Sequence, residues 1–177
     1  NFPRTAYAAD RTGHAMLHTL WEQAIKNGVN VYDEFHVLKI LTDKQRKRAS
    51  GVVAYEIATG TLHVIKGRAV LVATGGYSRV FAHNTNAMIN TGDGIALAMR
   101  AGAPAADLEF VQFHPTGLKS SGLLISEGVR GEGAYLIGKD GKRFMSKYAP
   151  NKLELASRDV VSRAEVMEIK AGNGVDG

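Results

Sequence analysis

The segment Ala69-Val70-Leu71-Val72-Ala73-Thr74-Gly75-Gly76 carries the strongest fold signal in the chain. Its first five residues are apolar on both faces, which is typical of a strand buried between the layers of an α/β protein. The strand is predicted to end at Thr74-Gly75-Gly76, and the carboxyl end of such a strand is where an α/β sheet usually binds its ligand. Because glycine has no side chain, the backbone N–H groups of this turn can approach a phosphate or a ring, although such glycine pairs also close ordinary turns.

The residues before this segment predict a helix and an antiparallel meander. A helix is expected from Asp10 to Asn27, because apolar residues recur there at helical spacing: Met16, Leu17, Leu20, Trp21, Ala24 and Ile25. Three segments rich in β-branched and aromatic residues follow, at Val31–Thr42, Gly51–Thr59 and Thr61–Lys66, with a tight turn at Thr59-Gly60. Together these features predict an α/β fold with α+β character.

The sequence after residue 76 predicts one more helix, then a loop-rich region, then a last helix. A second helix is predicted to start near Thr91, with Asp93 in its first turn, to face inward with Ile95, Ala98 and Met99, and to end at Ala101-Gly102. From about Phe110 the periodicity fades and glycine becomes frequent, as in a loop-rich substrate region. A last helix is expected over Ser157–Lys170, with an apolar side made of Val160, Val161, Ala164 and Met167. We therefore expect a domain boundary between residues 109 and 110.

Composition narrows the class of function. The 177 residues carry a net charge of +5 and contain no cysteine, so disulfides, thiolate catalysis and iron–sulfur ligation by this chain are excluded. No apolar run approaches the roughly 20 residues that span a bilayer, and no signal peptide is visible. The basic run 44–48 has no aromatic residues for base stacking, so we interpret it as a solvated hairpin tip and expect no nucleic-acid partner.

Four short stretches could carry chemistry. Asn90-Thr91-Gly92-Asp93 offers the amides of a helix start for a cofactor's polar edge, although an ordinary helix cap uses the same residues. His114 precedes a proline, so it is expected to be extended and rigid, suited either to a carboxylate or to a hydrogen bond within its turn. Glu127 and Arg130 are three residues apart and can pair if Ser126–Arg130 is helical.

Arg158 is the fourth. It would lie in the first turn of the last helix, where the helix dipole disfavours a cation. Either it pairs with Asp159 or Glu154, or it meets an anionic substrate, and the sequence leaves both open. His14 and His18 have the i, i+4 spacing of some metal ligands, but no third ligand follows, and no metal is expected.

Seven motifs in order resemble the succinate dehydrogenase and fumarate reductase flavoproteins. They span nearly the whole chain: residues 11–14, 73–76, 90–94, 112–117, 126–133, 143–145, and 148–150 followed by 157–161. The resemblance implies FAD as cofactor, held by Thr74, Gly75, Gly76 and Asp93, with the backbone around Val37 near the adenine. It also implies that residues 1–109 are part of an FAD-binding, Rossmann-like domain and that residues 110–177 begin a substrate-capping region.

The resemblance further implies a C4 dicarboxylate substrate, succinate or fumarate. His114 and Ser126 would bind a substrate carboxylate, the family commonly having threonine at the second position. Arg158 would transfer the proton, with Glu127 and Arg130 as its relay, while hydride passes between the substrate and flavin N5. The family's partners are an iron–sulfur subunit and membrane anchor subunits, which implies a peripheral place on the cytoplasmic or mitochondrial matrix face of an energy-converting membrane.

Departures from the family pattern predict an internal piece of a longer protein. No G-x-G-x-x-G follows a strand, so the pyrophosphate-binding start of the FAD domain is absent, and the chain begins at Asn1 and stops in a turn-like sequence. Alone, the polypeptide is expected neither to hold FAD tightly nor to turn over succinate. Two alternatives stay open, an L-aspartate oxidase and a non-catalytic α/β anion-binding module.

Overall fold

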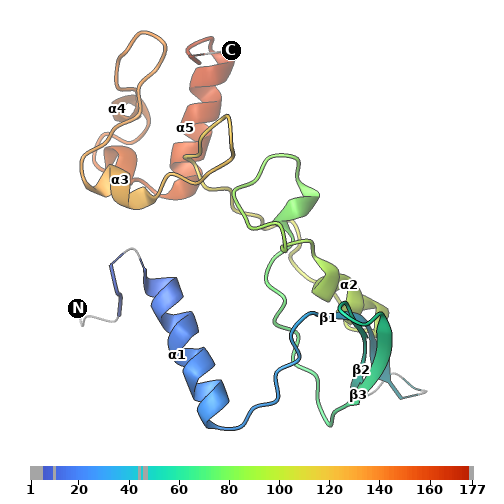
Figure 1. Ribbon diagram of the computed structural model, residues 1–177. Helices are drawn as coiled ribbons and strands as arrows, with labels where there is room; N and C mark the ends of the chain where they lie inside the picture. The colour runs from blue at the N-terminus through green and yellow to red at the C-terminus, as the bar shows by residue number, and fades with distance from the viewer. Residues whose placement is uncertain (1–5, 10, 44, 46–47, 176–177) are drawn as a thin grey trace.

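The computed structural model describes residues 6–9, 11–43, 45 and 48–175 (Figure 1). Asp10, the predicted start of the first helix, and Lys44, Arg46 and Lys47 of the basic run lie outside the described residues. In chain order the elements are α1 (Thr12–Lys26), β1 (Phe35–Thr42), β2 (Ala49–Glu56), β3 (Thr61–Lys66), the 3-10 turn η1 (Ser78–Val80), α2 (Asp93–Arg100), α3 (Glu127–Gly131), α4 (Met145–Tyr148), the 3-10 turn η2 (Leu153–Leu155) and α5 (Arg158–Lys170).

The three strands form the predicted antiparallel meander, in the order β1-β2-β3. β1 pairs with β2 from Phe35↔Glu56 to Thr42↔Ala49, and β2 pairs with β3 from Gly51↔Lys66 to Glu56↔Thr61. The predicted turn closes at Gly60, whose amide donates to the carbonyl of Glu56 and whose φ of +74° favours glycine. A register shift between Val37 and Lys39 marks a bulge in β1 beside the residue expected near the adenine.

The predicted strand over residues 69–73 is wrong for this chain. These residues form no strand, and Leu71 is 91% exposed. A strand exists only through backbone hydrogen bonds to a neighbour, and none of the described residues pairs with this segment. The pattern of apolar residues therefore indicates an extended segment, but it cannot identify a strand that pairs with it.

Helix α2 lies against β1 and confirms the predicted second helix (Figure 1). Its buried residues are Gly94 and Leu97, whereas Met99, predicted to face inward, is 49% exposed. The helix is rotated from the expected orientation because the close contact with residue 74, described below, takes place at Gly94. In the sheet, Ile40 and Ala54 are buried.

The helices α3, α4 and α5 form a second packed group at the other end of the molecule (Figure 1). Met145 and Val161 are fully buried at its centre, together with Ala156 and Ala164. Met167 was predicted on the apolar side of α5 but is 57% exposed, and the buried position one residue on is Glu168. Positions 161, 164 and 168 follow helical spacing, so a carboxylate occupies the end of the inward face.

Helix α1 stands apart from both groups (Figure 1), and none of its residues is buried. Its large apolar residues, among them Leu17, Leu20 and Trp21, are exposed. His14 and His18 are in ring contact with centroids 4.3 Å apart. In the described part of the chain, no helix combines the length and apolar character needed to cross a membrane.

Candidate functional site

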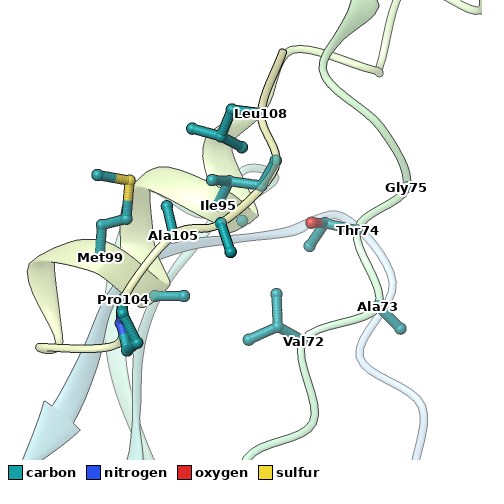
Figure 2. A pocket seen from close by; sticks show the side chains of 12 residues that line it. Val72, Ala73, Thr74, Gly75, Ile95, Met99, Pro104, Ala105 and Leu108 are labelled. Carbon is teal, nitrogen blue, oxygen red and sulfur yellow. The ribbon is translucent and has the colours of Figure 1, made fainter. Parts of the chain in front are cut away.

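Two glycine-containing stretches, residues 74–76 and 90–94, come together at the start of α2. The amide of Gly76 donates to Oδ1 of Asn90 over 3.3 Å. A Cβ on Gly94 would lie 1.8 Å from Oγ1 of Thr74, so the extended segment can rest on the helix only because position 94 has no side chain. The Thr74 hydroxyl points at α2 in Figure 2.

Two further glycines shape the same place. Gly75 has a φ of +72°, and Gly92, the residue before the helix, has a φ of +84°. A Cβ at Gly92 would lie 2.9 Å from Cβ of Tyr77, which is tighter than ordinary van der Waals contact. The result is bare backbone at a helix N-terminus, where N–H groups without helical partners are suited to an anionic or polar ligand edge.

A groove of about 390 Å³ runs between the extended segment and α2 (Figure 2). Val72, Ala73 and Thr74 line one side, and Ile95, Met99 and Leu108 line the other. Asp93 lies in the first turn of α2, where its Oδ2 accepts a 2.6 Å hydrogen bond from the Thr91 hydroxyl. Bare glycine backbone beside an apolar groove fits the edge and face of a flavin-containing dinucleotide, so residues 74–76 and 93 fit the cofactor expected from the sequence.

Residues 114–126 form a small hairpin that positions two predicted substrate ligands. The Ile125 amide donates to the Thr116 carbonyl over 3.1 Å, and the Thr116 hydroxyl donates to the Ile125 carbonyl over 2.8 Å. This pairing brings His114 and Ser126 to the same end of the hairpin. Thr116 also fixes the imidazole, because its carbonyl oxygen lies 2.9 Å from His114 Nδ1.

Each of these two side chains keeps one hydrogen-bonding function available. Nε2 of His114 makes no hydrogen bond within the described residues, and the ring lines a polar pocket of about 560 Å³ that also contains Arg79 and His83. Ser126 caps α3, its Oγ accepting from the Gly128 amide over 3.2 Å. A hydroxyl that accepts one bond can still donate another, so Ser126 retains a donor for a carboxylate.

Arg158 and the short helix α3 meet across 31 residues of sequence. Nε of Arg158 donates to Oε2 of Glu127 over 3.2 Å, and the same oxygen lies 4.0 Å from Nη2 of Arg130. Arg158 and Glu127 are each nearly half exposed, whereas the side chain of Arg130 is 3% exposed. The structure therefore brings together the three residues that the sequence predicted as a relay.

Neither of the local partners considered for Arg158 binds it. Asp159 pairs instead with Arg163, 2.6 Å away, and accepts from the Ser157 hydroxyl. Glu154 accepts from both Nε and Nη2 of Arg143. The pairing of Arg158 with Glu127 leaves its terminal nitrogens without hydrogen-bond partners in the described residues, and the side chain is 45% exposed.

Glu154, which the sequence offered only as a possible partner of Arg158, has a structural role instead. It is 2% exposed, and its Oε1 also accepts from the Leu136 amide over 3.2 Å. Burial alone would raise the pKa of Glu154, but the hydrogen bonds, that from Arg143 above all, hold it below its ordinary value. Its carbonyl accepts from Nη1 of Arg130, so it holds α3 in place.

Asn90 and Gly94 were also not predicted as site residues, although both lie in a motif that was. A signal existed for Gly94, because a glycine inside a predicted helix indicates close packing. No such signal existed for Asn90, since its role is defined by a contact 14 residues away.

The chain belongs to the FAD-binding domain family, whose model matches residues 1–176. Among its relatives is the succinate dehydrogenase flavoprotein subunit of Rickettsia bellii, 52% identical over 97% of this chain and 28% of that protein. The mitochondrial succinate dehydrogenase [ubiquinone] flavoprotein subunit of Oryza sativa subsp. japonica is 51% identical over 97% of this chain and 27% of that protein.

A solved structure supports the same family assignment. A variant of the FrdA chain of E. coli quinol fumarate reductase superposes with a TM-score of 0.91 at 42% identity, over 97% of this chain and 31% of that one. These findings confirm the resemblance to succinate dehydrogenase and fumarate reductase flavoproteins, the FAD-binding fold class and the expectation of FAD. The chain spans less than a third of the length of these relatives.

Proposed function

We propose that this chain supplies the proton-transferring side of a flavin-dependent site that interconverts succinate and fumarate. The observation that carries the proposal is the contact of Arg158 with Glu127, which in turn lies beside Arg130. Two cations share one carboxylate, and the outer cation keeps its terminal N–H groups for a ligand. Such an arginine suits a dicarboxylate, because a guanidinium binds carboxylates with two parallel hydrogen bonds.

His114 and Ser126 are proposed to bind one substrate carboxylate. Both lie at one end of the hairpin, and Ser126 is adjacent to Glu127 in α3. In the tautomer in which His114 Nδ1 accepts from the Thr116 amide over 3.2 Å, Nε2 carries the proton and can donate to a carboxylate oxygen. The Ser126 hydroxyl can donate to the same carboxylate while its oxygen accepts from the Gly128 amide. Their positions are thus set before substrate arrives, which lowers the entropy cost of binding.

Arg158 is proposed to move the proton at the substrate carbon, with Glu127 and Arg130 exchanging it onward. An arginine is a weak acid at neutral pH. Arg158 lies at the N-terminus of α5 with the Glu127 carboxylate on its Nε, and Arg130 lies beside the same carboxylate oxygen, so the three groups are in line to exchange a proton. FAD, bound at residues 74–76, 93 and near Val37, would supply the hydride exchange that completes the reaction.

The wider assignments are proposals of the same kind. We propose that residues 1–109 are part of an FAD-binding domain and that residues 110–177 are part of a substrate region. The rice relative's name places that protein in mitochondria, and the E. coli relative is named a quinol fumarate reductase. By that likeness we propose peripheral association with a membrane, through an iron–sulfur subunit and anchor subunits, on the cytoplasmic or matrix face.

The deciding experiment is Arg158→Ala in a full-length flavoprotein that contains this segment. Turnover of succinate and fumarate should fall by about 10²- to 10⁴-fold, as expected when a group that transfers the proton in the transition state is removed. The flavin absorption spectrum should be unchanged. The matched control is Arg163→Ala, one turn along the same helix, which should keep its activity.

Retained activity in Arg158→Ala would remove the proton-transfer role. Assays of the parent protein with L-aspartate and oxygen separate the oxidase alternative, and full flavin content without any turnover would support the non-catalytic module.

A further inference from the structure

Arg130, the buried member of the relay, makes one side-chain hydrogen bond within the described residues. Its Nη1 donates to the backbone carbonyl of Glu154, whereas Nε and Nη2 have no hydrogen-bond partner in the described part of the chain. Its counter-charge, Glu127, lies 4.0 Å from Nη2 and is also bound by Arg158. Because a guanidinium is a rigid plane, the position of the Glu154 carbonyl decides where Arg130 directs its remaining N–H groups.

The Glu154 carbonyl belongs to a turn, η2, whose backbone is strained. Leu153, its first residue, has a φ of +49°, a left-handed conformation that is costly for a bulky side chain. Such a conformation persists only where the surroundings hold it. The Leu153 amide donates to the Ala149 carbonyl over 2.7 Å, and the Glu154 side chain, in a residue that is 2% exposed, anchors the turn from within the helical group.

Arg143 provides the main anchor of that side chain. Its Nε lies 2.9 Å from Oε1 and 3.1 Å from Oε2 of Glu154, and its Nη2 also donates to Oε2. The guanidinium lies over the Tyr135 ring, 5.5 Å from the centroid, and the backbone leads directly into α4, where Met145 is fully buried. A guanidinium that bonds both oxygens fixes the direction of a carboxylate as well as balancing its charge.

Removal of Arg143 would leave the Glu154 carboxylate buried with little to balance its charge. Besides Arg143, its side-chain oxygens accept from the Leu136 amide within the described residues. A buried carboxylate that has lost its cation either takes up a proton or turns toward water. Because Leu153 is already strained, we expect the turn to move with the side chain and to take the carbonyl away from Arg130.

We propose that Arg143 is a positioning residue of the relay, which holds Glu154 so that its backbone carbonyl keeps Arg130 in place. This role rests on the proposed function of Arg158. Within the described residues Arg143 makes no hydrogen bond or ion pair with Glu127 or Arg158. Its effect on turnover is therefore expected to pass through Glu154 and Arg130.

The test is Arg143→Gln in the full-length flavoprotein within its complex. The kcat for succinate should fall about tenfold to a hundredfold, the cost of misplacing catalytic groups by a small distance, while KM and the flavin spectrum stay as in the parent. The solvent deuterium isotope effect on kcat should rise, because proton transfer becomes slower relative to the other steps. Loss of folded protein would lower the apparent kcat without changing the isotope effect.

Two further variants separate this role from a purely structural one. Arg143→Lys restores the positive charge but not the two parallel hydrogen bonds, so its kcat should lie between those of the parent and Arg143→Gln. Lys147→Gln removes another ion pair of the helical group, that with the buried Glu168, and should lower the melting temperature while keeping the parent's kcat and isotope effect. The proposal is overturned if Arg143→Gln keeps the parent's kcat, or if its lower kcat comes with the parent's isotope effect.

The outcome is distinguishable from failure of the proposed function. If Arg158→Ala is inactive while Arg143→Gln keeps the parent's kcat, only the role of Arg143 is lost. If Arg158→Ala is active, the relay itself is wrong, and the role of Arg143 is lost with it.

Discussion

The C-terminal group of helices and the sheet with α2 differ in how each satisfies its own polar and apolar groups. In the helical group, Met145 and Val161 are fully buried, and the buried carboxylates of Glu154 and Glu168 have protein partners. The sheet region buries little beyond Ile40, Ala54 and Leu97, and large apolar side chains of β3, Leu62 and Val64, remain exposed. The helical group thus has the more completely buried centre of the two regions.

The difference matters because the two regions hold different parts of the candidate site. The relay residues lie in the helical group, whereas the groove expected to bind the cofactor lies between residues 72–75 and α2. A site residue in the first region should be tied to stability, and one in the second should affect the cofactor without unfolding the helices. Three substitutions test that contrast.

The largest expected effect is from Met145→Ala. Truncating a fully buried methionine removes apolar contacts and leaves a cavity, so the free energy of unfolding should fall by about 2–5 kcal/mol. Urea unfolding followed by circular dichroism measures it. Met167→Ala, a methionine of the same group that is 57% exposed, should stay within about 0.5 kcal/mol of the parent. If the two substitutions had equal effects on the free energy of unfolding, burial at the centre of the helical group would not be what stabilises it.

The next effect is from Gly94→Ala. The added methyl group would collide with Thr74 and displace residues 74–76, at a cost of about 1–3 kcal/mol that should appear as lower flavin affinity. Flavin content per full-length protein, read from its absorbance, is the measurement. Gly131→Ala in α3, where a Cβ would meet nothing within 4 Å, is the matched control and should retain its flavin. The contrast fails if Gly94→Ala keeps full flavin.

The smallest expected effect is a change in how stability depends on pH in the acid range. Hydrogen bonds from Tyr148, Asn173 and Lys147 lower the pKa of Glu168 to about 2. Because the folded-state pKa lies below the ordinary value of 4.5, this carboxylate stabilises the fold above pH 4.5, and the contribution is lost as the pH falls toward 2. Glu168→Gln should remove that part of the pH dependence of the melting temperature, while Glu22→Gln on α1 should not. An unchanged slope in Glu168→Gln would contradict the assigned partners.

Local patterns predicted most of the helices and strands. The antiparallel meander, α1, α2 and α5 follow from alternation or helical spacing, since these signals depend on residues close in sequence. The strand over residues 69–73 was wrong because pairing depends on a distant partner. Met99 and Met167 were placed inward because an apolar residue at helical spacing is usually buried, whereas contacts at Gly94 and Glu168 decided the orientation.

The sequence named several of the candidate residues, but it predicted few of the contacts between them. Helical geometry suggested the pairing of Glu127 with Arg130, three residues apart. The partner of Arg158 was not predictable, because Glu127 lies 31 residues away and two acids lie closer in sequence.

The exposed run at residues 69–73 has a consequence for how the polypeptide behaves before it is complete. Five successive residues without charge or proline, rich in valine and leucine, and unpaired within the described residues, have the composition that templates intermolecular β-assembly. Any nascent or truncated form in which this run is exposed should self-associate until the run pairs with a neighbouring strand. The glycines that open the groove for a ligand thus directly follow a stretch of chain whose composition favours aggregation.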